Sequence, residues 1–228
     1  MSDEILNQGA EAIITRRGNE ITKERIAKSY RIKELDDKIR KLRTRSEAKI
    51  LEKASKIIPV PKVLKINEDS KEILMENIEG KRLSDFLDSF PLQKQKDICE
   101  KMGENISKIH ENNIIHGDLT PSNMILMEGD INNKPNEKLL SLTIPRGWVG
   151  GNTSNIFFID FGLGFISAKI EDKAVDLHLL REALEAGFAK NYEMLFDSVK
   201  KGYSKDYKDS KLILERFKAV EKRGRYRH

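Results

Sequence analysis

Two short acidic segments, each joined to a run of apolar residues, constrain this chain more than any other feature of its sequence. The first is the segment 116–123, HGDLTPSN, in which Asn123 follows Asp118 by five positions. The second is the segment 159–162, IDFG, and its Asp160 lies 42 positions after Asp118. Carboxylate and amide oxygens are the ligands that hard divalent cations prefer, and a carboxylate can also accept a proton from an attacking hydroxyl or water. A fold that brings the two segments together would therefore combine a metal site with a general base.

The order of these segments resembles that of protein kinases, whose catalytic loop reads H-R-D-L-x-x-x-N and is followed by D-F-G. Phosphoryl transfer requires a cation on the phosphates, metal ions that bridge them, and a carboxylate that orients the nucleophile. The resemblance implies that Asp118 is the catalytic aspartate and that Asn123 and Asp160 bind Mg²⁺ together with ATP. Each residue alone could be an ordinary turn or cap residue, and only the ordered set favours an enzyme. Gly117 replaces the arginine that usually binds the phosphorylated activation loop of protein kinases. We therefore do not expect phosphorylation of an activation loop to regulate this chain.

A lysine and a glutamate further upstream are expected to form the ion pair that positions the nucleotide phosphates. Lys23 stands at the end of a predicted strand and Glu47 in the middle of the following predicted helix. Lys28 is the competing lysine, and an ordinary surface ion pair is the alternative interpretation. The glycine-rich loop G-x-G-x-x-G is missing, and the segment 8–10, QGA, stands in its place with one glycine and backbone amides. The expected catalytic residues are Lys23, Glu47 and Asp118, and the expected ATP-binding residues are Gln8, Gly9, Ala10, Lys23, Glu76, Ile78, Asn123 and Asp160.

The periodicity of apolar residues predicts an α+β fold. Ile98, Met102, Ile106 and Ile109 recur at helical spacing and mark one face of a long helix, and the chain is expected to be mainly helical after Asp172. An earlier helix is expected over residues 35–58, and short strands are expected near residues 12–14, 21–23, 63–66, 73–75, 124–127 and 156–159.

These elements predict one protein-kinase-like domain of two lobes over residues 1–228. Residues 1–77 would form a small β-rich lobe with one long helix, and residues 78–228 a reduced, mainly helical lobe. A polar stretch at about 128–155 has no apolar periodicity and is expected to be an inserted surface loop.

Charge and cysteine content indicate the cell compartment and the kind of partner that we expect for the chain. The apolar runs are all shorter than the roughly 18 residues that a membrane span requires. A polar, acidic start and a single cysteine, Cys99, favour a reducing compartment, the cytoplasm or the nucleus. Cations crowd the segment 23–53, and Lys222, Arg223, Arg225 and Arg227 crowd the C-terminus. Either cluster could contact nucleic-acid phosphates, although a solvated helix face is an equal interpretation for the first.

The residues around the two acidic segments narrow the resemblance to one kinase family. Residues 7–12 read NQGAEA, residues 28–31 KSYR, residues 42–48 LRTRSEA and residues 223–225 RGR. Together with HGDLTPSN, they look like the atypical kinase subunit of the KEOPS (EKC) complex, the PRPK-type family, over nearly the whole chain. The insert departs from the compact archaeal members. In this family Asp176, in the triplet VDL, resembles the helix aspartate that braces the catalytic loop through backbone amides. An ordinary helix-capping aspartate is the other interpretation.

The resemblance implies a role in threonylcarbamoyladenosine modification of tRNA. Its implied partners are the threonylcarbamoyl-transferase subunit and a small regulatory subunit, and the arginine-rich C-terminus is a candidate contact for tRNA. Members are described as non-specific serine/threonine protein kinases, with ATP hydrolysis as the activity that the complex requires. Only 66 residues follow Gly162 and no A-P-E occurs, so little is left for a peptide-substrate platform. We therefore expect a partner to direct the phosphotransferase.

Three other functions remain open at this point. Aminoglycoside- and choline-type phosphotransferases share the H-G-D-L-x-x-x-N loop, but they need a large helical substrate domain for which the chain has no room. A RIO-like kinase is the second, and the segment at Asp160 argues against it because such kinases lack D-F-G in its usual form. A nucleotide-binding scaffold without turnover is the third, although it would have no need of an intact set of catalytic residues.

Overall fold

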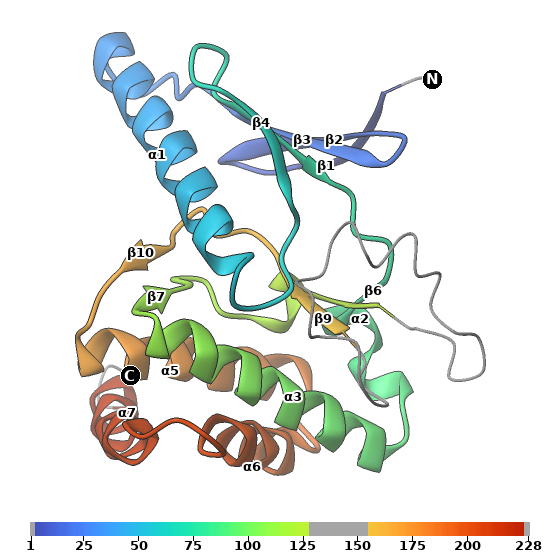
Figure 1. Ribbon diagram of the computed structural model, residues 1–228, viewed down its shortest axis with the longest axis vertical. Coiled ribbons are helices and arrows are strands. Elements are labelled where there is room, and N and C mark those ends of the chain that lie inside the picture. Colours follow the sequence, from blue (N-terminus) through green and yellow to red (C-terminus); the bar gives the residue numbers. More distant parts are fainter. Residues whose placement is uncertain (1–2, 128–154, 226–228) are drawn as a thin grey trace.

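The computed structural model describes residues 3–127 and 155–225, and an antiparallel sheet forms one end of it (Figure 1). Its five strands lie in the order β1-β2-β3-β5-β4. Their bounds are β1 Glu4–Gln8, β2 Ala12–Arg17, β3 Glu20–Arg25, β4 Val63–Asn67 and β5 Glu72–Glu76. Gly18 occupies the first position of the two-residue turn between β2 and β3 with a φ of +60°, a conformation that glycine adopts without steric cost. This hairpin places Lys23 opposite Ile14 on the neighbouring strand.

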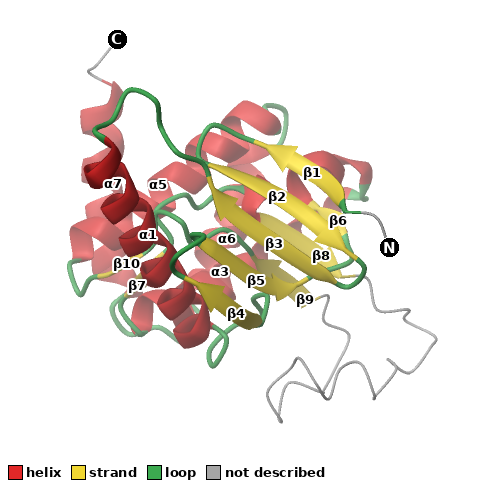
Figure 2. Cartoon of the chain, turned by 90° about the horizontal axis from the view of Figure 1, so that it is seen from above, coloured by secondary structure: helices red, strands yellow, loops and turns green. Residues whose placement is uncertain are grey.

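One long helix, α1 (Lys33–Ala54), accompanies the sheet and reaches towards the helical end of the molecule (Figures 1 and 2). Ala48 packs there with Ile73 and Met75 of β5. The sequence predicted this helix over residues 35–58, and its end was placed too late. The chain turns after Ala54, where Ile57 N–H donates to the Ala54 carbonyl at 2.8 Å, because Pro59 disfavours helical backbone just before it.

The helical end of the molecule holds the main hydrophobic core. It is built from α3 (Leu92–Glu111), α5 (Ile170–Gly187), α6 (Tyr192–Tyr203) and α7 (Ser210–Arg225), with the short α2 (Leu83–Phe86) beside them. The predicted stripe of α3 is buried, since Ile98, Met102, Ile106 and Ile109 are at most 2% exposed. The same core takes in Leu51 of α1, so one continuous core joins that helix to the helical end. Among the described residues, no helix is both long and apolar enough to cross a bilayer.

Two small sheets lie between the two ends and carry the acidic segments. One pairs β6 (Lys81–Arg82), β8 (Met124–Met127) and β9 (Asn155–Phe158), and the other pairs β7 (Ile114–Ile115) with β10 (Phe165–Ile166). The α+β, two-lobed architecture predicted from the sequence is confirmed. The polar insert lies outside the described residues except at its end, and the lobe boundary after residue 77 stays a prediction.

Candidate active site

The buried ammonium of Lys23 holds together three elements that are far apart in the sequence. Its Nζ lies 2.7 Å from Oε1 of Glu47 and 2.7 Å from Oδ1 of Asp160. Lys23 comes from β3, Glu47 from α1, and Asp160 from the loop after β9. The side chains of Lys23 and Glu47 are 7% and 1% exposed, whereas that of Asp160 is 47% exposed. The structure thus brings these residues together with one carboxylate accessible from solvent.

Arg25 is a second cation in this cluster and was not predicted as a site residue from the sequence. Its Nη2 donates to Oε2 of Glu47 at 2.5 Å, and its side chain is 5% exposed. A Cβ at Gly162 would lie 3.3 Å from that same nitrogen and 3.4 Å from Nζ of Lys23. Alternate strand residues point to the same face, so the spacing of Arg25 from Lys23 was the signal that could have found it. Each carboxylate oxygen of Glu47 therefore has its own cation.

We predict that Arg25→Met lowers kcat for ATP hydrolysis by about ten-fold, because a small displacement of Glu47 misplaces Lys23. The KM for ATP should change less than kcat, since the ammonium of Lys23 and its charge are retained. Arg25→Lys should recover part of the loss by restoring the charge near Glu47. Steady-state kinetics of both variants test this expectation. Arg16→Met is the matched control, because Arg16 pairs with Glu4 at an exposed site on the same sheet. Equal losses in the two methionine variants would contradict a positioning role for Arg25.

The charges of the cluster stabilise one another. Burial lowers the pKa of Lys23, but Glu47 and Asp160 outweigh it, so the pKa lies above its ordinary value. Burial raises the pKa of Asp160, but the charge and hydrogen bond of Lys23 outweigh burial, so the pKa of Asp160 lies below its ordinary value. Lys23 is therefore charged and Asp160 ionised at neutral pH.

The loop that carries Asp118 is held by its own side chains. Asn123 donates from Nδ2 to Oδ2 of Asp118 at 2.8 Å and to the backbone oxygen of Asp118 at 2.9 Å. The Asp118 side chain remains exposed. Gly117 has a φ of +80°, and a Cβ there would lie 2.3 Å from the backbone oxygen of Leu163. This close contact explains physically why glycine stands where protein kinases usually have arginine.

Asp176 of α5 braces this loop, which is the first of the two interpretations that the sequence left open. Its buried carboxylate accepts hydrogen bonds from the backbone N–H of His116 at 2.7 Å and of Gly117 at 2.9 Å. His110 lies 3.2 Å from the same carboxylate and 2.9 Å from the hydroxyl of Tyr203. Asp176 is not a cap, because it lies inside the helix and binds a different segment. The brace thus links the loop of Asp118 to α3, α5 and α6.

His116 is buried as a neutral imidazole. Its Nε2 lies 3.1 Å from the backbone oxygen of Ile159 and must donate there, which leaves Nδ1 to accept from the backbone N–H of Asp118 at 3.3 Å. Burial, opposed by nearby carboxylates, lowers the pKa of His116 below its ordinary 6.5. The ring therefore connects the loop of Asp118 to the loop of Asp160.

From this pKa we predict a loss of stability on mild acidification. Because the unfolded chain binds the proton of His116 more readily than the folded chain, the unfolding free energy should fall as pH drops below about 6.5, by at most about 1.4 kcal/mol per pH unit. Urea unfolding between pH 5 and pH 6.5 measures the slope. His116→Gln should flatten it by removing the titrating ring. An unchanged slope in that variant would assign the pH dependence to other groups.

The donor atoms suit Mg²⁺ bound together with a triphosphate. Asp160 and Asn123 offer a carboxylate and an amide oxygen, and Mg²⁺ in such sites takes one or two protein ligands and completes its shell with phosphates and water. Among the described residues, no three His, Cys, Asp or Glu side chains gather into a self-sufficient metal site. Asp160 has a φ of +60°, a backbone conformation that tends to occur at functional loops. These observations fit a metal held jointly with substrate.

Within the described part of the chain, the remaining predicted ATP-binding residues make no hydrogen bond to Lys23, Glu47 or Asp160. Lys28 donates to the backbone oxygen of Ala10, so the competing lysine ties down the loop after β1. Within that loop Gly9 N–H donates to the Ala12 carbonyl at 3.1 Å. Burial raises the pKa of Glu76 at the end of β5. The roles of Gln8, Gly9, Ala10, Glu76 and Ile78 in binding ATP stay predictions.

Comparisons with known proteins agree on the family. The protein kinase domain family matches residues 2–169. The chain is 40% identical to the KEOPS complex subunit Bud32 of Pyrococcus abyssi, over 91% of this chain and 84% of that protein. It is 37% identical to a probable bifunctional tRNA threonylcarbamoyladenosine biosynthesis protein of Methanobrevibacter smithii, over 100% of this chain. There the match spans only 38% of the longer relative.

A solved structure extends the agreement to the fold. The complex of Rio2 kinase from Chaetomium thermophilum with ADP/Mg²⁺ and phosphoaspartate superimposes with a TM-score of 0.60, over 100% of this chain and 72% of that one, at 14% identity. So low an identity supports the shared fold alone. The extent and identity of the sequence matches establish the family. This chain belongs to the protein kinase domain family and, within it, to the Bud32 family.

Proposed function

We propose that this chain is the ATP-dependent phosphotransferase and ATPase of a KEOPS complex, and that it supports threonylcarbamoyladenosine modification of tRNA. The observation that carries the proposal is the position of the Lys23 ammonium, 2.7 Å from both Glu47 and Asp160. A surface ion pair would not be buried between two lobes, nor end at an exposed carboxylate beside the catalytic loop. The names of the Pyrococcus and Methanobrevibacter relatives support the assignment to KEOPS and to tRNA modification.

Each residue of the site has a proposed role in the chemistry. Lys23, fixed by Glu47, binds the phosphates of ATP, and Asn123 and Asp160 bind Mg²⁺. When bound, the metal neutralises charge that develops on the transferred phosphoryl group. Asp118 accepts the proton of the attacking water or hydroxyl, and the amide of Asn123 holds the carboxylate of Asp118 in place. The machinery acts by positioning and by charge, which is what phosphoryl transfer demands.

A partner is proposed to decide what receives the phosphoryl group. The segment after Asp160 runs through β10 and enters α5 at Ile170, which leaves little backbone for gripping a peptide substrate. Serine/threonine kinase activity would then be directed by the transferase subunit and the small regulatory subunit. Contact with tRNA through the C-terminus remains part of the proposal, although Arg223 is already bound to Glu171. A cytoplasmic or nuclear location would suit these partners.

ATP turnover with and without the transferase subunit tests the proposal. We expect turnover to rise when the partner is added. Asp118→Ala should reduce it by about 10²–10⁴-fold in both conditions, because the carboxylate that accepts the proton is lost. Asp88→Ala, at an exposed position outside the site, is the matched control and should match the wild type. Turnover that survives Asp118→Ala would instead favour a nucleotide-binding scaffold.

A further inference from the structure

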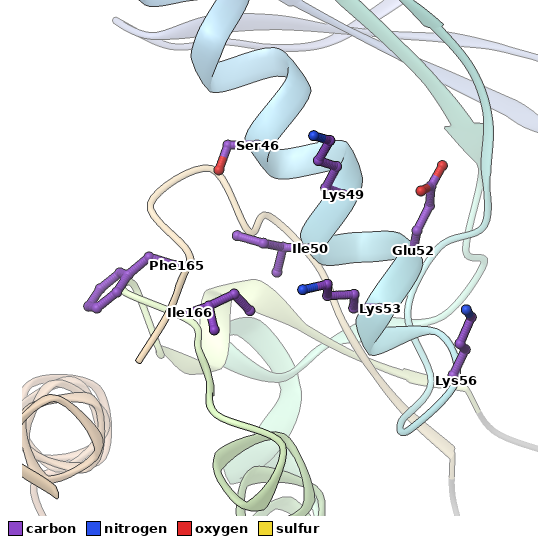
Figure 3. Close-up of a pocket in the computed structure, with 8 residues that line it drawn as sticks. All are labelled: Ser46, Lys49, Ile50, Glu52, Lys53, Lys56, Phe165 and Ile166. Carbon is purple, nitrogen blue, oxygen red and sulfur yellow. The ribbon is translucent and has the colours of Figure 1, made fainter. Parts of the chain in front are cut away.

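A groove lies between the C-terminal half of α1 and strand β10, outside the set of residues assigned to ATP (Figure 3). Its volume is about 340 Å³. Ile50 of α1 and Phe165 and Ile166 of β10 provide its apolar surface. Phe165 and Ile166 are 43% and 50% exposed, so β10 leaves two adjacent large apolar side chains accessible beside the groove. The space is large enough for one or two side chains of a partner, but not for a folded domain.

The rim of this groove carries an excess of positive charge, with three lysines against the single carboxylate of Glu52. Lys49, Lys53 and Lys56 line it, and none of the three lies within ion-pair distance of a carboxylate among the described residues. Glu68 interacts electrostatically with Lys49, but its carboxylate is already hydrogen-bonded to Arg45. Lys53 and Lys56 could be explained by the C-terminal end of α1, where cations complement the helix dipole. Lys49 lies too far from that end for this explanation.

The three arginines of α1 are held in ion pairs, whereas Lys33 and Lys38, like the groove lysines, have none within the described residues. Arg40 binds Asp36 at 2.7 Å, Arg43 binds Glu11 at 2.8 Å, and Arg45 binds Glu68 at 2.5 Å. The three groove lysines differ from Lys33 and Lys38 in their surroundings, because they lie beside the exposed apolar side chains of β10.

We propose that this groove binds an extended acidic segment of a partner protein, anchored by an aromatic or leucine side chain. An apolar anchor in a pocket with a charged rim is the usual arrangement of a peptide-docking site. The apolar surface of Phe165 and Ile166 would take the anchor, and the lysines would pair with flanking carboxylates. The inference deepens the proposed function, on which it rests for the claim that a partner directs this kinase.

A nucleic acid fits the groove less well than an acidic protein segment. Phosphate-binding surfaces depend on cations that follow the backbone of the nucleic acid. Here Glu52 interrupts the row of lysines, so they form no continuous track for evenly spaced phosphates, whereas a protein segment can place single carboxylates at the lysines alone. Most of what a ligand would cover between the lysines is aliphatic or aromatic. An oligonucleotide therefore serves as a competing probe in the test.

The position of the groove connects its occupancy to the active site. Ile50 lies one helical turn after Glu47 on α1. Phe165 pairs with Ile115 of β7, which directly precedes His116. A segment bound here would hold α1 against the catalytic loop and so favour the arrangement in which Lys23 contacts Glu47. By linkage, the segment should bind more tightly when nucleotide is bound, and nucleotide more tightly when the segment is bound.

Fluorescence anisotropy with the full chain tests the proposal, and a labelled peptide, Asp-Glu-Asp-Phe-Leu-Glu-Asp-Glu, is the probe. We expect a dissociation constant of about 10–100 µM, typical of a short docking segment. Serine in place of Phe and Leu, or lysine in place of the acidic residues, should weaken binding by about ten-fold or more. Addition of ADP and Mg²⁺ should strengthen binding of the original peptide by about five-fold.

Variants of the chain locate the binding site. Lys49→Glu should weaken peptide binding by about five-fold or more, and Phe165→Ser should do the same by removing apolar contact. Lys38→Glu is the matched control, since Lys38 is an exposed lysine of the same helix outside the groove, and it should bind like the wild type within about two-fold. Unchanged thermal unfolding of Lys49→Glu, at an exposed helical position, would show that the variant is folded.

Several results would overturn the proposal. They are no saturable peptide binding at about millimolar concentration, equal binding by wild type and Lys49→Glu, or tighter binding of a twelve-nucleotide oligouridylate that Lys49→Glu abolishes. The last would assign the groove to nucleic acid. Because the measurement is of binding, it is separable from turnover. Peptide binding without ATP hydrolysis would remove the proposed function alone, and hydrolysis without peptide binding would remove this inference alone.

Discussion

Replacement of Lys23 by methionine should lower kcat/KM for ATP hydrolysis by about 10²–10³-fold, the range seen when one preorganised electrostatic contact is removed from an active site. The ammonium contacts both Glu47 and Asp160. Its loss would remove the cation that binds the phosphates, and it would also remove the link between α1 and the loop of Asp160. Methionine fills much of the same buried volume, which limits the effect on packing. Steady-state ATP hydrolysis and nucleotide affinity, measured on the purified chain, would show the loss.

Lys28→Met is the decisive comparison, because Lys28 was the competing lysine in the sequence. Its ammonium binds the backbone oxygen of Ala10 and not the site, so we expect only a rise in the KM for ATP of about two- to five-fold from loosening of that loop. The Lys23 variant should also stay folded, since Arg25 still neutralises Glu47. Similar losses of turnover in the two lysine variants would mean that the structure assigns the wrong lysine to the phosphates.

The fold could be predicted where apolar residues recur in the sequence with a clear period. The apolar stripe of α3 gave the helix and its buried face. Strand β1 was missed because all of Glu4–Gln8 is exposed, and without a buried face a strand leaves no alternation in the sequence. The pairing of β7 with β10 was missed because each strand has two residues, too few for any period. Long-range pairing, not local pattern, creates these elements.

The candidate site shows the same division between local pattern and assembly. Asp118, Asn123 and Asp160 stand in short motifs that can be read from the chain, and a backbone hydrogen bond from Ile159 to Asn123 joins the two motifs in the structure. Arg25 stands in no motif and becomes part of the site only because β3 faces α1. The reason for glycine at position 117 could not be seen either, since it depends on a backbone contact with Leu163. Residues that act through packing need the assembled structure.

The helical end should be even less tolerant of change than the site, at a residue that no sequence motif marks. Gly202 lies inside α6, where it packs against α3 so closely that a Cβ would lie 1.8 Å from the backbone oxygen of Glu100. Gly103 of α3 makes the reciprocal contact, with a Cβ position 2.0 Å from the backbone oxygen of Val199. Gly202→Ala would force the two helices apart, and we expect a loss of about 3 kcal/mol or more in the free energy of unfolding. For a domain of this size that corresponds to a fall in Tm of about 6–12 °C.

Helix propensity alone predicts the opposite sign, which makes Gly202→Ala informative. Alanine is about 1 kcal/mol more favourable than glycine inside a helix. Gly187→Ala, at the end of α5, is the matched control, because a Cβ there would meet nothing within 4 Å. We expect that variant to be unchanged or more stable by at most about 1 kcal/mol. Chemical denaturation of both variants gives the comparison. Because the brace of Asp176 reaches Tyr203 through His110, separation of α3 and α6 should also lower ATP turnover in the fraction of Gly202→Ala that remains folded. A Gly202→Ala variant as stable as the wild type would show that the two helices can be separated without penalty, and would remove the physical basis for this rigid support under the catalytic loop.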